Sequence, residues 1–157
     1  MKVIVSSEVS GYSLKEEIVR YLKDKGYDVL EVGQMKNGPT VYYPEAASEV
    51  AKMILGKQAE KAILICGTGA GVSIVANKFK GIYCVACESL FTAGKISFVN
   101  NANVLAMGRN GVGPGQAFAM VDAFLESGFA KNASPERRDE LQGYLNRVIK
   151  IEDENFR

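Results

Sequence analysis

Apolar runs of strand length alternate with amphipathic runs of helix length along almost the whole chain. The predicted strands cover 2–6, 28–32, 62–66, 82–87 and 103–107. The predicted helices cover 13–25, 44–55, 72–79, 91–99, 114–125 and 135–149. Such alternation with short links is typical of a parallel sheet with right-handed crossovers. We therefore expect an α/β protein, a three-layer Rossmann-like fold with a five-stranded parallel sheet, helices on both faces and an additional C-terminal helix.

Residues at several predicted helix ends fit the expected capping chemistry. Ser13 and Glu16 have the spacing of a capping box, and Gly26 follows the same helix where a C-cap belongs. Ser134 and Pro135 begin the last helix as N-cap and first-turn residue. No repeat or linker divides the sequence. We expect a single domain over 1–157, with a core over 1–138 and a C-terminal helix and tail over 139–157.

The charge balance gives no case for a broad electrostatic partner. The chain has 19 Lys and Arg residues against 18 Asp and Glu residues, so neither nucleic acid nor an anionic membrane is expected to bind. No stretch of about 18 apolar residues is present, which also argues against a membrane-spanning segment. We expect a cytoplasmic protein that holds any anionic ligand by local groups.

The three cysteines and the absence of histidine limit the possible chemistry. An odd number of cysteines in a chain of this size indicates free thiols. Cys84 and Cys87 lie in an apolar run, whereas a redox pair of this spacing belongs at a helix N-terminus, so we interpret them as structural. Without histidine the commonest general base and metal ligand is missing, and we expect neither a metal nor a cofactor.

One loop carries the strongest chemical signal, and it joins the third predicted strand to the next helix. Ligands of parallel sheets bind beyond the carboxyl ends of the strands, where this loop lies. Gly67, Gly69 and Gly71 let the backbone approach a ligand and direct several N–H groups at one point, as in an anion or oxyanion site. The loop matches neither the P-loop nor the dinucleotide motif. A tight strand-to-helix turn without a ligand is the alternative.

Cys66 immediately precedes these glycines. A thiol at the end of a strand, facing a helix N-terminus and several amides, should favour its thiolate form. Such a thiolate can act as a base or as a nucleophile. The alternative is a thiol buried in the core.

The stretch from Ile63 to Ile82 closely resembles the signature of the family that contains ribose-5-phosphate isomerase B and the galactose-6-phosphate isomerase subunits. The resemblance extends from residue 2 to about residue 138. Further matching segments are 14–18, 43–44, 100–108, 112–113 and 121–125. A match of this length implies the family's fold.

The resemblance also implies roles for individual residues. Cys66 would move a proton between C1 and C2 of an open-chain sugar phosphate, and the loop from Gly67 to Gly71, with the Thr68 hydroxyl, would stabilise the enediolate. The implied catalytic residues are Cys66 and Thr68. The expected substrate-binding residues are Glu8, Tyr43, Gly67, Gly69, Ala70, Gly71, Ser73, Asn100, Arg109 and Arg137. Asn100 would come from a neighbouring subunit, so we expect a homodimer or tetramer, or a hetero-oligomer with a relative.

The chain departs from the family pattern at its polar site residues. The family's Asp-His pair after the first strand is Glu8-Val9 here, and the histidine that opens the sugar ring is Val99. Of three phosphate-binding arginines, alignment without gaps places Asn110 and Ala133 at the first two positions and keeps Arg137; Arg109, Lys131 and Arg138 lie close in sequence.

The retained and lost residues together favour a particular reaction. We expect an aldose–ketose isomerase that uses Cys66 but acts on a short or acyclic sugar phosphate, which needs no ring opening, rather than on ribose 5-phosphate. One alternative is a catalytically impaired subunit that pairs with an active relative or binds a metabolite. A flavodoxin-like cofactor binder is a weaker alternative.

Overall fold

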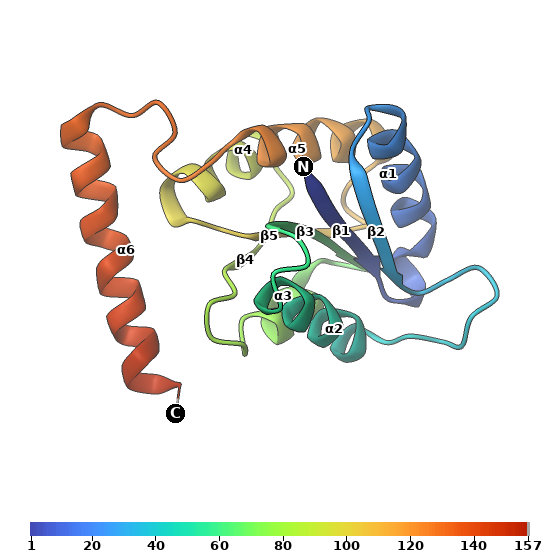
Figure 1. Ribbon diagram of the computed structural model, residues 1–157. Helices are drawn as coiled ribbons and strands as arrows, with labels where there is room; N and C mark the ends of the chain where they lie inside the picture. The colour runs from blue at the N-terminus through green and yellow to red at the C-terminus, as the bar shows by residue number, and fades with distance from the viewer. Residues whose placement is uncertain (157) are drawn as a thin grey trace.

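A computed structural model of the chain describes residues 1–156 (Figure 1). Its strands are β1 (Lys2–Ser7), β2 (Asp28–Gly33), β3 (Lys61–Cys66), β4 (Cys84–Ala86) and β5 (Val104–Gly108). Its helices are α1 (Tyr12–Asp24), α2 (Tyr43–Leu55), α3 (Ala70–Ala76), α4 (Leu90–Asn100), α5 (Pro114–Glu126) and α6 (Pro135–Asn155), and a short 3-10 turn, η1 (Val9–Gly11), precedes α1. The five strands pair in parallel in the order β2-β1-β3-β5-β4, which confirms the expected α/β sheet.

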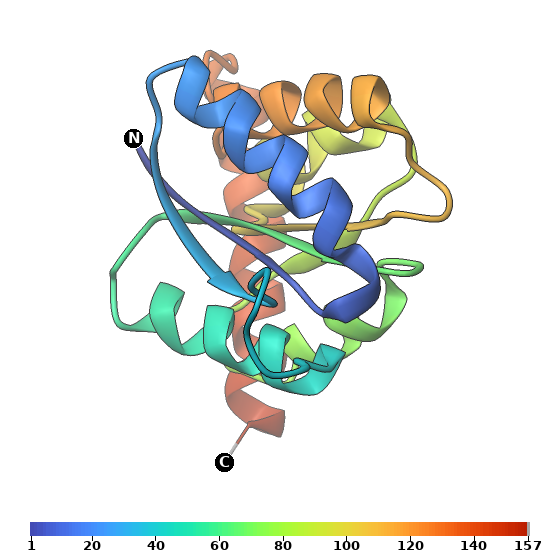
Figure 2. The ribbon, with the colours of Figure 1, turned by 90° about the vertical axis from the view of Figure 1, so that its right-hand side faces the viewer.

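Helices cover both faces of the sheet, as Figure 2 shows with α1 and α5 on one side and α2 and α3 on the other. Successive strand residues point to opposite faces, so Val3 and Val5 pack in one core while Ile4 packs in the other. The central strands are therefore apolar on both faces, as parallel sheets require. Because the strands are parallel, they all end at the same edge of the sheet, where the loops to the next helices begin.

Two local predictions need correction. The capping box of Ser13 and Glu16 is wrong, because α1 begins at Tyr12 with Gly11 as its N-cap and without a side-chain cap. The turn η1 leads the chain into the helix, and it is Glu8 that caps this turn by accepting from the Gly11 amide. Strand β4 is shorter than the predicted 82–87, since the Asn103 side chain rather than a strand partner receives the Tyr83 amide at 2.9 Å.

Other helix-end predictions are confirmed. Gly26 follows α1 with a φ of +83°, a backbone conformation that favours glycine at a helix end. The hydroxyl of Ser134 caps α6 by accepting from the Arg137 amide at 3.3 Å. None of the helices within residues 1–156 has both the length and the apolar character needed to cross a membrane.

Helix α6 extends to Asn155, beyond the predicted end at 149, and lies past the outer strand β4 (Figure 1). Its last turns are fixed to the chain segment before β4. The Glu152 carboxylate accepts from the Gly81 amide at 2.7 Å and from the Tyr83 hydroxyl at 3.1 Å, and Lys80 pairs with Asp153 at 2.6 Å. These contacts explain the extra length, which apolar periodicity alone does not signal. The last residue of the predicted tail, 157, lies outside the described residues.

Candidate functional site

The carboxyl ends of β1, β3 and β5 lie side by side at one edge of the sheet. Strand β2, which follows β1, lies on one side of it, whereas β4 and β5, which follow β3, lie on the other side of the sheet. A sheet of this kind opens a crevice where the crossing direction reverses. The loops after Ser7, Cys66 and Gly108 therefore surround the natural ligand position of the fold.

Cys66 ends the central strand β3 and is 5% exposed. Its Sγ accepts a hydrogen bond from the Gly69 amide at 3.1 Å. Gly69 has a φ of +79°, which only glycine adopts easily and which turns its N–H back toward the sulfur. This hydrogen bond fixes the position of the sulfur at the start of the glycine loop. Cys66 is thus a buried residue that packs in one of the two cores and ends β3 at the edge where the glycine loop begins.

The glycine loop is fastened to the loop that follows β5. The Arg109 amide donates to the Cys66 carbonyl at 2.9 Å, and the Asn110 amide donates to the Gly67 carbonyl at 3.0 Å. Gly108 passes so close to the loop that a Cβ there would lie 2.5 Å from the carbonyl carbon of Thr68. The Thr68 Oγ1 accepts from the Ala70 amide at 3.3 Å. The position of the Thr68 backbone therefore depends on the absence of a side chain at Gly108.

Tyr43 lies against the same loop, as the sequence predicts. A Cβ placed on Gly71 would be 3.0 Å from Cδ2 of the Tyr43 ring. Tyr43 is the first residue of α2 and remains partly exposed. Its ring therefore forms one wall of the edge at which Cys66 ends.

Glu8 follows β1 and is only 8% exposed, although it is a carboxylate. Its backbone amide donates to the Ile65 carbonyl at 3.2 Å, which places it beside the end of β3. Its Oε1 accepts from the Gly11 amide at 3.2 Å and from the Ser10 hydroxyl. The carboxylate is thus fixed next to the residue that precedes Cys66.

Two side chains near the loop escape the sequence analysis as site residues. A Cβ on Gly67 would lie 3.3 Å from Asn110 Nδ2 and 3.3 Å from Ser10 Oγ. Asn110 is noticeable in sequence only as a replaced arginine, and Ser10 lies in a short turn that resembles ordinary surface. The feature of the sequence that could have identified them is their position, because each follows a strand that ends at this edge.

A buried lysine organises the loop between β2 and α2. Lys15 has no exposed surface, pairs with Glu31 at 3.0 Å and donates to the carbonyls of Val32 and Gln34. The Gln34 side chain in turn accepts from the Val41 amide at 2.9 Å, two residues before Tyr43. Lys15 therefore holds the loop that carries the Tyr43 ring to the glycine loop.

The remaining predicted site residues do not join this cluster within one chain. Asn100 ends α4 just before β5, so it lies toward the amino ends of the strands. Arg137 lies on α6 beyond β4 and pairs with Glu140 at 2.6 Å (Figure 1). Arg109 lies directly after β5 with an exposed side chain, and the Ser73 hydroxyl donates to the Cys84 carbonyl at 3.3 Å. Lys131, close to them in sequence, donates to the Glu126 carbonyl at 2.7 Å.

All three cysteines are free thiols, as the odd count predicts. Burial raises the pKa of Cys84 to about 12 and that of Cys87 to about 11. Both side chains therefore stay protonated near neutral pH and behave as small apolar groups. Within residues 1–156, no group of three or more His, Cys, Asp or Glu side chains is arranged to hold a metal ion.

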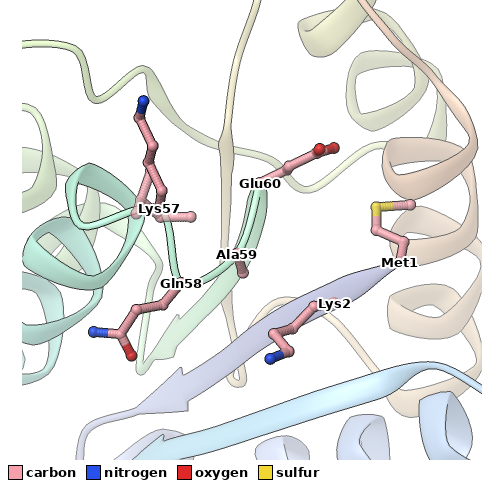
Figure 3. Close-up of a pocket in the computed structure, with 7 residues that line it drawn as sticks. Met1, Lys2, Lys57, Gln58, Ala59 and Glu60 are labelled. Atoms are coloured by element: carbon pink, nitrogen blue, oxygen red, sulfur yellow. The ribbon is translucent and has the colours of Figure 1, made fainter.

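A separate hollow lies at the amino ends of β1 and β3, opposite the glycine loop. It is lined by Met1, Lys2, Ile54, Lys57, Gln58, Ala59 and Glu60. The labelled side chains do not point toward one another (Figure 3). Lys2 already pairs with Asp28 at 3.6 Å, and Glu60 adds a negative charge. The hollow therefore lacks the convergent polar groups found at the edge around Cys66.

Comparison with known proteins finds a family match over most of the chain. The family described as Ribose/Galactose Isomerase matches residues 3–141. The 4-deoxy-4-sulfo-D-erythrose isomerase of Clostridium sp. (strain MSTE9) is 40% identical over 157 residues, which cover 100% of this chain and 99% of that protein. The D-erythrulose-4-phosphate isomerase of Pectobacterium atrosepticum is 31% identical over 144 residues, covering 92% of this chain and 95% of that protein.

The same similarity holds in three dimensions. The structure of Clostridium thermocellum ribose-5-phosphate isomerase B superposes with a TM-score of 0.88 and 34% sequence identity. The alignment covers 98% of this chain and 99% of that one. The coverage includes α6, so the C-terminal helix has a counterpart in a solved relative.

Proposed function

The chain belongs to the ribose/galactose isomerase family, and from that premise we propose that it is an aldose–ketose isomerase for a short acyclic sugar with an anionic group at its far end. The observation that carries the proposal is the hydrogen bond from the Gly69 amide to Cys66 Sγ at the carboxyl end of β3. It supports a thiolate base at the position where ligands bind in this fold.

The proposed reaction uses Cys66 as the proton carrier. The thiolate removes the proton from C2 of the aldose, and the electron pair forms the C1–C2 double bond of an enediolate while charge develops on O1. The thiol then returns a proton to C1, and a second proton passes from O2 to O1, so the carbonyl moves to C2. No net oxidation occurs. The free N–H groups of the glycine loop and the Thr68 hydroxyl are suited to stabilise the developing charge.

The lost histidines favour a substrate that is already open. Val9 and Val99 occupy the positions of the family's two site histidines, and neither side chain can donate a proton to a ring oxygen. A four-carbon aldose whose C4 carries a sulfonate or phosphate has no free hydroxyl with which to close a five-membered ring. The names of two relatives describe four-carbon sugars with an anionic group at C4, an aldose in one name and a ketose in the other. We infer that this chain also takes a four-carbon substrate.

A second copy of the chain is proposed to complete the site. In one chain Asn100 and Arg137 lie away from Cys66, although the family uses their counterparts in substrate binding. Ile74 on α3 and Leu90 and Phe91 at the start of α4 are exposed apolar side chains, and Phe91 is 75% exposed. Large apolar side chains that are left exposed in this way suit a subunit interface. We therefore expect a homodimer.

Proton NMR tests the function directly. Purified protein is incubated with 4-deoxy-4-sulfo-erythrose, erythrose 4-phosphate and ribose 5-phosphate, and loss of the aldehyde or anomeric signal is followed against growth of the ketose signal. We expect turnover of a four-carbon substrate and little turnover of ribose 5-phosphate. Binding without turnover of any of them would refute the enzyme and favour a metabolite-binding subunit. Faster turnover of ribose 5-phosphate would refute the inferred substrate.

A further inference from the structure

Two polar side chains from different strand ends lie beside Gly67, and the carboxylate of Glu8 accepts a hydrogen bond from one of them, Ser10. Ser10 and Glu8 follow β1, and Asn110 follows β5. The Ser10 Oγ and the Asn110 Nδ2 each lie 3.3 Å from the point where a Gly67 Cβ would stand. Gly67 is the residue next to Cys66, so these groups flank the proposed reacting centre.

The chemistry of this cluster indicates what it can bind. A carboxylate accepts hydrogen bonds, an amide both donates and accepts, and a hydroxyl does both. A sugar hydroxyl is a donor and an acceptor at once, so it matches the set. A sulfonate or phosphate group does not match this set, because the Glu8 carboxylate would repel the anion. Either anion also only accepts hydrogen bonds, so it offers no donor to the carboxylate. The cluster therefore fits a hydroxyl group on an uncharged part of the substrate. It does not fit the charged end of the substrate.

The hydroxyl can be assigned along the carbon chain. In the proposed reaction C1 and C2 lie at Cys66 and the loop amides. The first hydroxyl beyond them is the one on C3, and it takes no part in the chemistry. The charged group follows on C4, where it would extend away from Glu8.

We propose that Glu8, Ser10 and Asn110 form a subsite for the C3 hydroxyl, with Ser10 as the positioning residue of Glu8. The inference rests on the proposed function and deepens it. Both observed donors to Glu8, the Gly11 amide and the Ser10 hydroxyl, bind Oε1. This fixes the carboxylate plane and leaves Oε2 to the substrate. The chain places serine at this position, where an alanine would leave the carboxylate with the amide alone.

The experiment compares variants on two substrates, 4-deoxy-4-sulfo-erythrose and its 3-deoxy analogue, which can still isomerise. For Ser10→Ala and Asn110→Ala we expect kcat/KM on the parent substrate to fall about tenfold, mainly through KM. Ser10→Ala removes a hydrogen bond to the buried Glu8 carboxylate, and Asn110→Ala removes a proposed partner of the substrate hydroxyl. On the 3-deoxy analogue the same variants should lose less than about twofold, since the bond partner is absent. Ser10→Thr keeps the hydroxyl and should recover most of the loss. Ser13→Ala, at an exposed serine of α1, is the matched control.

Binding measured by calorimetry in a Cys66→Ala background separates the two proposals, because it needs no turnover. If the variants weaken the parent ligand but not the analogue while wild-type protein shows no turnover, the subsite stands and the enzymatic function fails. Equal losses on both ligands indicate a purely structural role and overturn the subsite. Unchanged affinity in both variants overturns it as well. Thermal unfolding midpoints within a few degrees of the wild type verify that each variant is folded.

Discussion

Gly108 offers a sharp test of whether the position of the Thr68 loop controls activity. In Gly108→Ala the added Cβ would lie 2.5 Å from the Thr68 carbonyl carbon and 2.6 Å from its Cα, about 0.9 Å short of the 3.4 Å at which ordinary contact begins. Backbone atoms on both sides cannot swing aside as a side chain can. The Thr68 loop must therefore retreat by nearly 1 Å.

A displacement of this size is costly for catalysis, because misplacing a catalytic group by about 1 Å lowers the rate by about 100-fold. We expect kcat/KM of Gly108→Ala to fall by about that factor. Overpacking should also lower the free energy of unfolding by about 1 to 3 kcal/mol. Initial rates with the four-carbon substrate and urea unfolding measure the two effects separately.

Gly115→Ala is the matched control, because a Cβ on Gly115 meets nothing within 4 Å and the residue lies in the first turn of α5. Its activity should stay within about twofold of the wild type, and its stability should be equal or slightly higher, since alanine favours a helix by up to about 1 kcal/mol. Full activity in a folded Gly108→Ala protein would refute the argument that the loop position matters.

Two further predictions concern stability. Lys15→Met should lower the free energy of unfolding, measured in urea, by about 3 kcal/mol, because it leaves Glu31 and two carbonyls without their buried partner. The control, Lys150→Met at an exposed lysine, should change it by less than about 0.5 kcal/mol. A loss below about 1 kcal/mol for Lys15→Met would contradict this role of Lys15. Burial raises the pKa of the Cys87 thiol to about 11 in the folded state. In the unfolded chain this thiol has a lower pKa, about 9, and loses its proton first. The free energy of unfolding should therefore fall as pH rises from about 9 to 11. Cys87→Ala should reduce that slope in parallel urea titrations, with the buried Cys84 thiol accounting for part of what remains, and an unchanged slope would argue against Cys87 as a contributor.

Much of the fold follows from local pattern. The alternation of strand and helix, the C-cap glycine at Gly26 and the N-cap at Ser134 act through neighbouring residues, so sequence reasoning reaches them. The predicted capping box at Ser13 fails because Glu8 and Gly11 start the turn one step earlier. The length of α6 depends on contacts of Glu152 with Gly81 and Tyr83, about 70 residues away, which no local pattern records.

The site shows the same division. Cys66 and its glycine loop are contiguous, so a reading of the sequence finds them together. Ser10 and Asn110 lie 100 positions apart and meet only because β1, β3 and β5 end at one edge. The buried position of Lys15 is equally invisible, because a lysine on an amphipathic helix ordinarily reaches solvent.

In the proposed reaction Cys66 carries the proton between C1 and C2. The most direct measurement is deuterium incorporation at C1 of the ketose during turnover of 4-deoxy-4-sulfo-erythrose in heavy water, followed by NMR for the wild type and for Cys66→Ala. We predict incorporation with the wild type and a rate lower by about 100-fold or more with Cys66→Ala, with ligand affinity by calorimetry changed only a few fold. Incorporation by a folded Cys66→Ala protein at the wild-type rate would contradict the claim.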